Sequence, residues 1–472
     1  MDRERRREPA IPLFILNIRR RLFLLQSSSA AVALALTGCG GGGDGSADGT
    51  GSDAAASAGT DSNATVAAAP VPAAPVTPSN AGQVAGGPSR PFGARLTAYS
   101  AGIKPARDAG AMDAALTAQY DAWKAARVVS AASIVPGGSA VQFSNPTYLT
   151  VSEGMGYGML IAVLFAGHDP DARALFDGLL ATVRARPAYA VVPFDPNGKY
   201  LMDWRINADG TSAGEGWNAM DGDLDIALAL LMADRQWGSG GTWNYLQEGQ
   251  NTIAALKSWN MRQDGTTKGL REGKNNRTSD YMVGHFRAFK AVTGDSLWDL
   301  AVDRAYILLD KMQTKYSPGV GLVPDFVIDT DSDDEQPSKG YIGDGNDKEG
   351  YFWWNACRDP WRLASDYVLS GDDRFKLVTG RMIEFFEKKS GGDPTNIGTG
   401  YALDGTQLTG GNSPAYHGPI CAGACVDARF QGFLDTMWDW NVKHLTTGYY
   451  DGEIQLLSMV VASGNWWTPF RG

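Results

Sequence analysis

The sequence contains a recurring motif in which a glycine ends one apolar segment and an aspartate begins the next. It occurs in "LFAGHDPDARALF" (164–176), "AVTGDSLWDLA" (291–301) and "VLSGDDRFKLV" (368–378). Glycine readily adopts the left-handed conformation that closes a helix, and an aspartate can accept hydrogen bonds from the free amides of the next helix. The motif therefore predicts helices joined in pairs by tight turns.

Apolar residues recur with a period of 3.6 in almost every long segment after residue 108, whereas strand-like alternation is scarce. The helix before each glycine turn is mostly apolar and the following one carries more charge, which suggests an inner helix paired with an outer one. We predict an all-α fold, an (α/α)6 double helical barrel with functional loops at one open end; a plain α-solenoid is the alternative. The expected helices are 110–128, 153–167, 170–185, 222–236, 243–260, 280–293, 297–316, 357–369, 372–389, 427–441 and 451–463.

The N-terminal segment has a basic start, an apolar stretch and small residues at its end, as export signals do. Arg20-Arg21 and the residues after them resemble a twin-arginine signal, and Leu36-Thr37-Gly38-Cys39 resembles a bacterial lipobox. We predict an export signal with lipobox over 1–39, a flexible Gly/Ala/Ser/Pro linker over 40–90 and one folded domain over 91–472. A lipid on Cys39 would place the protein at the outer membrane or cell surface; an ordinary secretory peptide would leave it secreted or periplasmic.

The composition limits the classes of partner. A formal net charge of -10 argues against nucleic acid, and four scattered histidines give little support for zinc, so no metal or cofactor is predicted. In "CAGAC" we expect a disulfide between Cys421 and Cys425, because the segment reads as a glycine-rich loop of an exported protein. Cys357 is expected to be a buried free thiol.

One acid, Glu153, precedes three glycines and an apolar run in "TVSEGMGYGMLIAVLFAG" (150–167). After Ser152, a good N-cap, it would lie in the first helical turn, where the helix dipole lowers the pKa of a carboxyl. A catalytic acid needs a raised pKa, which apolar neighbours such as Tyr157 could supply, and the glycines would let a ligand approach the backbone. Local evidence leaves both a structural cap and a working acid open.

Three aspartates at 221, 223 and 225 open a second apolar segment, "NAMDGDLDIALALLMADRQW" (218–237). One is expected to cap the helix and the others to lie in its first turn, but three exceed what capping requires. The spacing of an EF-hand is absent. Two carboxylates that meet from separate helix starts would suit glycoside hydrolysis.

Together, "SEGMGYGM" and "DGDLDIALALLMADRQW" strongly resemble family 8 of the glycoside hydrolases, whose members cut cellulose, mixed-linkage glucan, xylan or chitosan. Matching motifs follow in order: "RTSDYMVGHFRAF" (277–289), "KYSPGVGLVPDFV" (315–327), "NACRDPWRLASDY" (355–367) and "GNWWTP" (464–469). The resemblance spans 91–472 and implies the double helical barrel. It places Glu153 on the family's general acid and Asp221 on the carboxylate that holds and distorts the sugar. Because the family inverts, a base must activate water on the opposite face of the sugar.

The expected base position of many members holds an amide here, Asn355, which cannot take a proton from water. One branch of the family, resembling chitosanases and lichenases, has Asn at this position and takes its base from a loop upstream. Here that loop, 325–349, contains nine acids and two lysines. Asp344 is the best match, with Asp347 and Glu349 as rivals, and loss of the base is the remaining alternative. We interpret 329–335 as a solvated acidic stretch, with a calcium site as the minority interpretation.

Aromatic and charged residues near these motifs complete the candidate cleft. Trp204, Trp217, Tyr281, Trp353 and Trp354 are candidates for stacking on sugar rings, although core packing is an equal alternative for each. Arg358 and Arg362 are interpreted as charge partners of cleft acids. The candidate substrate-binding residues are Tyr157, Trp204, Trp217, Asp280, Tyr281, Asn355 and Arg358.

The sequence thus predicts an exported, monomeric, inverting endo-hydrolase of β-1,4-linked polysaccharide that needs no cofactor. We rank β-glucan or mixed-linkage glucan above chitosan, which the acidic chain could attract, and xylan below both. The rival from another class is a surface glycan-binding protein that has lost its base.

Overall fold

Apolar and charged helices alternate along the chain, and this alternation determines which helices lie at the centre. The computed structural model describes residues 87–268, 274–340 and 347–469, and within them it contains twelve α-helices. Residues 1–86, with the predicted signal and most of the predicted linker, lie outside this range. Ser89 and Arg90 already donate backbone hydrogen bonds to Gln236, so the ordered domain begins slightly before the predicted boundary at 91.

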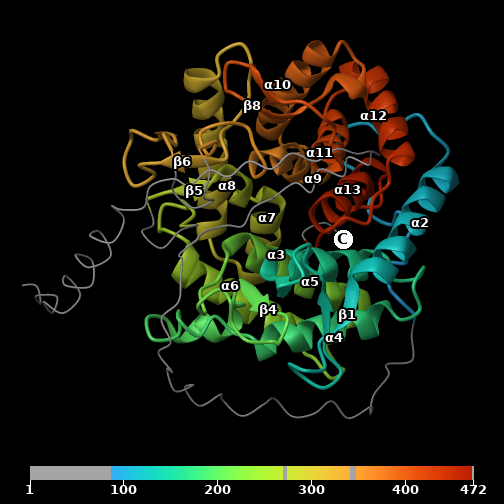
Figure 1. Cartoon of the computed structure of the whole chain (residues 1–472), viewed down its shortest axis with the longest axis vertical. Helices are drawn as coiled ribbons and strands as arrows, with labels where there is room; N and C mark the ends of the chain where they lie inside the picture. Colours follow the sequence, from blue (N-terminus) through green and yellow to red (C-terminus); the bar gives the residue numbers. More distant parts are fainter. Residues whose placement is uncertain (1–86, 269–273, 341–346, 470–472) are drawn as a thin grey trace, which may run out of the picture. The chain divides into compact units, whose positions relative to one another are not determined.

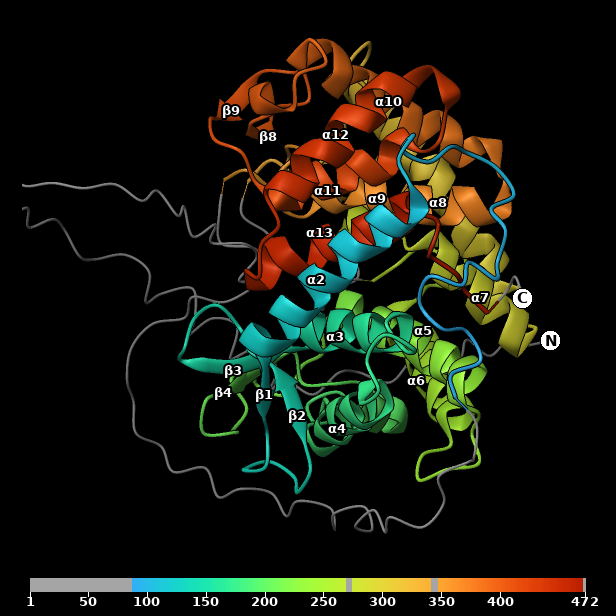
Figure 2. The same cartoon turned by 90° about the vertical axis from the view of Figure 1, so that its right-hand side faces the viewer.

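Six helices whose residues are mostly buried form a closed inner ring (Figures 1 and 2). Each packs against the next inner helix along the chain, and the last packs against the first. In α3 every residue is buried, including the polar ones, because the helix is surrounded by protein on all sides. The inner helices are α3 (Ser152–Leu164), α5 (Met220–Trp237), α7 (Val283–Thr293), α9 (Asp359–Ser370), α11 (Pro414–Ala424) and α13 (Tyr449–Ala462).

Six amphipathic helices form the outer ring, and each packs against one inner helix. Five outer helices follow their inner partner directly in the chain. The sixth, α2, comes first and pairs with the last helix, α13, through a hydrogen bond from Gln119 to Gln455 of 2.9 Å. The predicted double helical barrel is therefore confirmed. The outer helices are α2 (Ala109–Arg127), α4 (Ala172–Ala185), α6 (Tyr245–Asn260), α8 (Leu297–Lys311), α10 (Asp373–Ser390) and α12 (Gln431–Lys443).

The predicted turn chemistry holds at two of the three motifs. Gly294 and Gly371 are left-handed and close α7 and α9, and the carboxylate of Asp372 accepts the amide of Arg374 at the start of α10. At the first motif Gly167 also has a positive φ, of 96°, but Asp171 makes no capping hydrogen bond. Glycine thus has the predicted conformation at all three turns, and aspartate capping varies between them.

The helix α11 was not predicted, because its Gly and Pro content resembles a loop. Pro414 occupies its first turn, and a Cβ on Gly418 would lie 2.9 Å from the backbone of Gln455 in α13. Close packing within the ring therefore outweighs the poor helix propensity of glycine. The disulfide prediction was wrong for the same reason: Cys421 and Cys425 are one helical turn apart, and both thiols are buried and free. Cys357 is a buried free thiol, as predicted.

Short antiparallel strand pairs connect the helices on the loops. They comprise β1 (Val128–Ser130) with β2 (Ser139–Val141), β3 (Tyr148–Val151) with β4 (Arg205–Asn207), and β8 (Thr399–Tyr401) with β9 (Gln407–Thr409). A three-stranded sheet joins β5 (Asn276–Arg277), β6 (Phe326–Ile328) and β7 (Gln336–Pro337). Two of these elements matter for function, because β3 leads directly into α3 and β5 carries Arg277.

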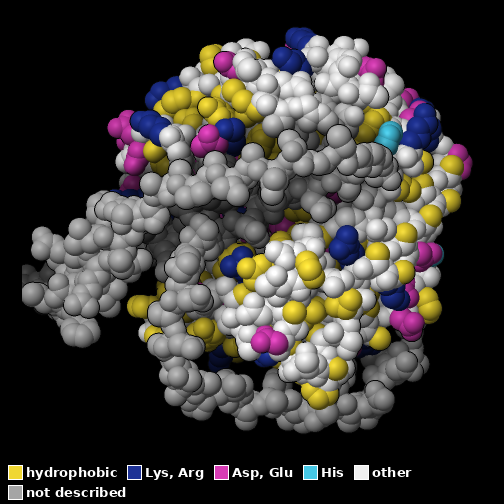
Figure 3. All heavy atoms as spheres, in the orientation of Figure 1, with side chains coloured by type: hydrophobic (Ala, Val, Ile, Leu, Met, Phe, Trp, Pro, Cys, Tyr) yellow, Lys and Arg dark blue, Asp and Glu magenta, His cyan; other side chains and the backbone are white. Residues whose placement is uncertain are grey.

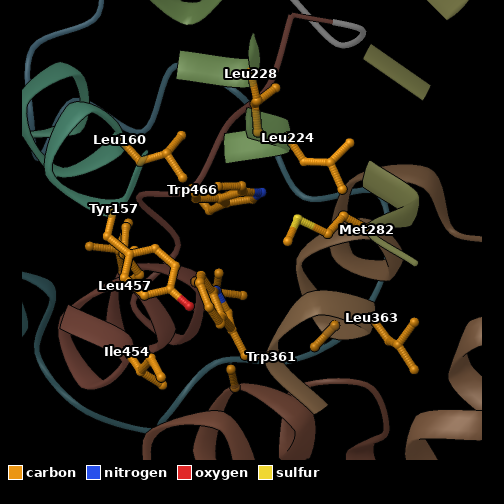
Figure 4. Close-up of a cluster of buried hydrophobic side chains, with 14 of the residues drawn as sticks. Tyr157, Leu160, Leu224, Leu228, Met282, Trp361, Leu363, Ile454, Leu457 and Trp466 are labelled. Carbon is orange, nitrogen blue, oxygen red and sulfur yellow. The ribbon is translucent and has the colours of Figure 1, made fainter. Parts of the chain in front are cut away.

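Side chains from the inner helices meet at the centre of the ring (Figure 4). Leu160 comes from α3, Leu224 from α5 and Leu457 from α13, and Trp361 and Trp466 lie among them. On the face drawn in Figure 3, hydrophobic side chains are interspersed with charges of both signs. Among the described residues, no helix has the length and apolar character needed to cross a membrane.

Candidate active site

The acids singled out in the sequence lie at the beginnings of two neighbouring inner helices. Glu153 is the second residue of α3 and Asp221 the second residue of α5, and both are buried. The capping predictions were wrong, because Val151 and Ala219 occupy the N-cap positions and neither helix has a side-chain cap. The acids are therefore not used as caps, and their side chains are available for other contacts.

The glycines after Glu153 have a different role from the predicted one. A Cβ on Gly154 would lie 2.5 Å from the ring of Tyr449, and a Cβ on Gly156 would lie 2.8 Å from Asp225 of α5. A Cβ on Gly158 would lie 2.5 Å from Val141. The glycines thus allow close packing of the protein around α3, and not the approach of a ligand to its backbone.

Arg358 connects the two acids. Its Nη1 donates to Glu153 Oε2 at 2.6 Å and to Asp221 Oδ2 at 3.1 Å, and its side chain is fully buried. Arg358 therefore reaches substrate only through the acids it holds, which fits its interpretation as a charge partner. Tyr449 donates from the other side, from its hydroxyl to Glu153 Oε1 at 2.8 Å.

The two acids have opposite pKa shifts. Burial raises the pKa of Glu153, and Asp221 adds to this shift, while Arg358 and Tyr449 only partly offset it. Burial would also raise the pKa of Asp221, but Arg277 and Arg358 outweigh it and hold that pKa well below its usual range. A carboxylic acid beside a carboxylate is the pairing that an acid-catalysed bond cleavage needs.

Asp280 is a third buried acid beside Glu153 and Asp221, and we call these three residues the acid cluster. Arg277 bridges Asp221 and Asp280, with Nη2 2.9 Å from Asp221 Oδ1 and Nε 3.1 Å from Asp280 Oδ2. Burial raises the pKa of Asp280 to about 6. Three acids therefore share two arginines, and the raised pKa values of Glu153 and Asp280 are consistent with this excess of acid.

Asn355 lies directly behind this cluster and is fully buried. Its amide Nδ2 donates to Asp325 Oδ2 at 3.1 Å, while its Oδ1 accepts from Arg358 Nη2 at 3.0 Å. Asp325 also accepts three backbone amides from residues 353–356, and burial raises its pKa to about 6. Asn355 thus orients Arg358, and an aspartate here would bring a second carboxylate against Asp325.

The structure separates the candidate bases. Asp344 lies outside the described residues. Asp347 is exposed and paired with Lys348 at 2.6 Å, whereas Glu349 is fully buried and accepts from Ser338 Oγ at 3.3 Å. Glu335, at the end of the acidic stretch, is buried and paired with Arg304 and Lys311, so that stretch is anchored and not wholly solvated.

The aromatic candidates fall into two groups. Trp204 lines a pocket of about 20 Å³ together with Glu153, Asp221 and Arg277, and Trp217 is half-buried nearby. Tyr157 and Tyr281 are buried, and the ring of Tyr157 packs on Trp361 (Figure 4), so neither ring is open to a sugar. For Tyr281 the core-packing alternative is correct, and Tyr157 is a buried neighbour of Glu153.

Trp353 and Trp354 pack mainly against protein. A Cβ on Gly400 would meet the ring of Trp353, and the ring edges of Trp354 contact Tyr416 and Tyr450.

No group of three His, Cys, Asp or Glu residues suited to a metal occurs in the part of the chain that the structure describes.

Three contributors to the cluster were missed. Arg277 and Asp325 lie within motifs that resemble the family, but their residue types alone did not distinguish them from structural charges. Tyr449 lies in "TTGYYDGEIQ", where two successive tyrosines at a helix start gave no signal. Only the fold brings all three to Glu153 and Asn355.

Comparison with known proteins agrees with this geometry. The family model described as glycosyl hydrolases family 8 matches residues 108–464. The chain belongs to glycoside hydrolase family 8. This family 8 enzyme is 36% identical over 389 residues to a β-glucanase of Niallia circulans, which covers 81% of this chain and 92% of that protein. An endoglucanase of a Bacillus species is 35% identical, covering 80% and 82%.

A solved structure of similar sequence supports the same fold. The apo structure of a β-1,3-1,4-glucanase from Paenibacillus superposes with a TM-score of 0.75 at 35% identity, over 81% of this chain and all of that one. A family 8 xylobiose complex from Teredinibacter turnerae, at 19% identity and a TM-score of 0.63, shares the fold. The chain is therefore a glycoside hydrolase with the double helical barrel.

Proposed function

We propose that this hydrolase cuts β-glucan within the chain, at β-1,4 bonds and with inversion at the anomeric carbon. The observation that carries the proposal is the pair of buried acids with opposite pKa shifts, Glu153 and Asp221, beside a small pocket. Relatives that are β-glucanases and an endoglucanase favour β-glucan as the polymer.

Glu153 would protonate the leaving oxygen. Its raised pKa favours the protonated form, and Arg358, 2.6 Å from Oε2, would stabilise the carboxylate that forms when the proton leaves. Asp221 remains ionised and would accept hydroxyl hydrogen bonds from the sugar while its charge stabilises the positive ring of the transition state.

The base would come from the acidic loop. Asp344 remains the proposed residue, on its distance from Asn355 in the sequence. Of its rivals, Glu349 is buried against Ser338, which leaves Asp347 as the exposed alternative. Such a base would activate water on the face of the sugar opposite Glu153.

The first test measures the release of reducing ends by the chain on lichenan, carboxymethyl-cellulose, chitosan and xylan. Glu153→Gln keeps the shape of the side chain but removes the proton, so we expect at least about a 100-fold loss of kcat with an unchanged circular dichroism spectrum. Glu387→Gln on the outer helix α10 is the matched control and should retain activity. Full activity in Glu153→Gln, or release from chitosan alone, would overturn the assignment of the acid or of the polymer.

The second test addresses the base and the stereochemistry. Proton NMR of the first products should show the α-anomer from the β-linked polymer, because water attacks opposite the leaving oxygen. Asp344→Asn should abolish turnover while binding persists. Asp347→Asn, three residues further along the chain, is the control. If Asp347→Asn alone abolishes turnover, the base has been assigned to the wrong residue; if β-anomers appear first, the enzyme retains.

A further inference from the structure

An exposed apolar loop lies beside the acid cluster. Of the seven large hydrophobic side chains that are exposed in the described residues, three belong to this one loop between α4 and β4: Phe194 at 72%, Tyr189 at 55% and Val192 at 37%. Exposed apolar side chains that gather in one place mark a binding surface more often than single ones do. This loop is therefore a candidate contact for a ligand.

Phe194 forms a group of three aromatic rings with Trp217 and Trp259. The ring centroids are 6.3 Å apart for Phe194 and Trp217, 6.2 Å for Phe194 and Trp259, and 6.3 Å for the two tryptophans, with interplanar angles of 14–28°. Three nearly parallel rings at equal distances cannot form a single column, in which the outer two would lie twice as far apart. They form a triangle whose outer surface includes Phe194, 72% exposed, and two half-buried tryptophans.

The surface is held in place by the protein before any ligand binds. Trp259 Nε1 donates to Asn218 Oδ1 at 3.0 Å, and the Asn218 amide donates to Asp223 and Asn260. The Asp195 carboxylate, next to Phe194, accepts the amide of Asn197 and fixes the turn that follows. A preformed surface loses little conformational entropy on binding.

Backbone hydrogen bonds connect this surface to the acid cluster. Trp204, which lines the pocket with Glu153, donates its backbone amide to the carbonyl of Trp217 at 2.9 Å, and Ser152 donates to the carbonyl of Trp204 at 2.8 Å. The chain then runs from Trp217 directly into the start of α5, which carries Asp221.

The small pocket explains why such a surface is needed. Its volume of about 20 Å³ accommodates roughly one water molecule and cannot enclose a sugar ring. The affinity for a polymer must therefore arise on open surfaces beside the acids. The C–H face of a pyranose ring packs well on an aromatic ring, and Phe194 offers one that is 72% exposed beside Trp217 and Trp259.

We propose that Phe194, Trp217 and Trp259 form a distal sugar-binding subsite that holds a β-glucan chain outside the cleavage site. This inference rests on the proposed function and adds that the enzyme prefers long chains. Rings on a loose loop, or rings in a contact between two copies of the chain, would also lie at the surface. Neither alternative explains the backbone hydrogen bonds that connect Trp217 through Trp204 to the start of α3.

The test compares Phe194→Ala with Ile307→Ala, an equally apolar control that is 54% exposed on the outer helix α8. Binding is measured by electrophoresis through gels containing lichenan, in the Glu153→Gln background so that no polymer is cut. We expect Phe194→Ala to weaken binding about 3- to 10-fold, Phe194→Trp to restore it, and Ile307→Ala to leave it unchanged. In the active enzyme, the ratio of kcat/KM for lichenan to that for a short oligosaccharide should fall by the same factor.

Each alternative outcome is distinct. If wild type cuts lichenan but Phe194→Ala binds it equally well, the subsite is absent and the proposed function stands. If wild type neither binds nor cuts β-glucan, both fail. If Phe194→Ala instead changes the sedimentation coefficient at high concentration and leaves polymer binding unaffected, the rings are a contact between copies, and the inference is overturned.

Discussion

Two layers of buried charge lie one helical turn apart in the barrel, and they differ in what they can do. We call Glu153, Asp221 and Arg358 the acid layer, and Asp225, His285 and Arg362 the support layer. Asp221 and Asp225 are four residues apart on α5, and Arg358 and Arg362 are four residues apart at the start of α9. The same pairing of an aspartate with an arginine is thus repeated along both helices.

In the support layer, both oxygens of the aspartate are paired. Arg362 donates to both oxygens of Asp225, at 2.7 and 2.6 Å, and His285 Nε2 lies 2.7 Å from the same carboxylate. Although burial alone would raise it, these partners hold the pKa of Asp225 below its usual value. A bidentate buried pair of this kind fixes geometry and has no proton to give.

The acid layer has more acid than its arginines can balance. One nitrogen of Arg358 serves both Glu153 and Asp221, and Arg277 is shared between Asp221 and Asp280. The pKa of Glu153 is raised, and so is that of Asp280 beside it. Burial acts to raise the pKa of both Glu153 and Asp225, so the comparison indicates that a buried carboxyl keeps a raised pKa only where its charged partners do not offset burial.

The largest expected effect comes from replacing the arginine of each layer in turn, which should affect the two layers differently. Arg362→Met leaves Asp225 buried beside His285, whose pKa is lowered by burial, so we expect the free energy of unfolding to fall by about 3–5 kcal/mol. Arg358→Met should cost less stability, because the raised pKa of Glu153 favours its uncharged form and Asp221 keeps Arg277. It should instead reduce kcat at least about 100-fold.

Urea denaturation and kinetics on lichenan measure both quantities for each variant. The two layers would have the same role if both variants lost stability and activity to the same extent. Lys376→Met, on an exposed pair of the outer helix α10, is the control and should change neither quantity appreciably.

The second expected effect concerns the contact that aligns the layers. A Cβ on Gly156 would lie 2.8 Å from Asp225 Cβ and 2.9 Å from the carbonyl of Gly222, so Gly156→Ala must push α3 and α5 apart. We expect a loss of about 1–3 kcal/mol in unfolding free energy and a fall in kcat, since Glu153 and Asp221 lie on these two helices. Gly432→Ala on α12, where the space is open, is the control. Unchanged activity in a destabilised Gly156→Ala protein would show that catalysis tolerates this shift.

The same two helices show what a sequence can predict. Period, glycine turns and ordered motifs were sufficient for the helical barrel and for placing Glu153 and Asp221 at helix starts. The sequence could not show that Val151 and Ala219 take the cap positions, nor that the glycines of α3 face Tyr449 and α5. Those properties depend on which helices become neighbours, and α11 was missed for the same reason, since ring packing outweighs its local propensity.

The smallest expected effect concerns Tyr449, which donates a hydrogen bond to Glu153 as Arg358 does. Tyr449 donates to Glu153 Oε1 at 2.8 Å and stabilises its ionised form, so Tyr449→Phe should raise the pKa of Glu153 further. Activity needs protonated Glu153, and the alkaline limb of the kcat/KM profile should therefore move to higher pH, by up to about one unit. The same shift affects stability. The folded pKa of Glu153 lies above its unfolded value of about 4.3, so the protein loses stability as the pH rises from the unfolded to the folded pKa. Tyr449→Phe should extend this loss to higher pH. Tyr189→Phe, on the exposed loop, should leave the limb in place. A shift to lower pH in Tyr449→Phe would mean that the hydroxyl stabilises the protonated acid, and the balance of charges argued for the acid layer would then be wrong.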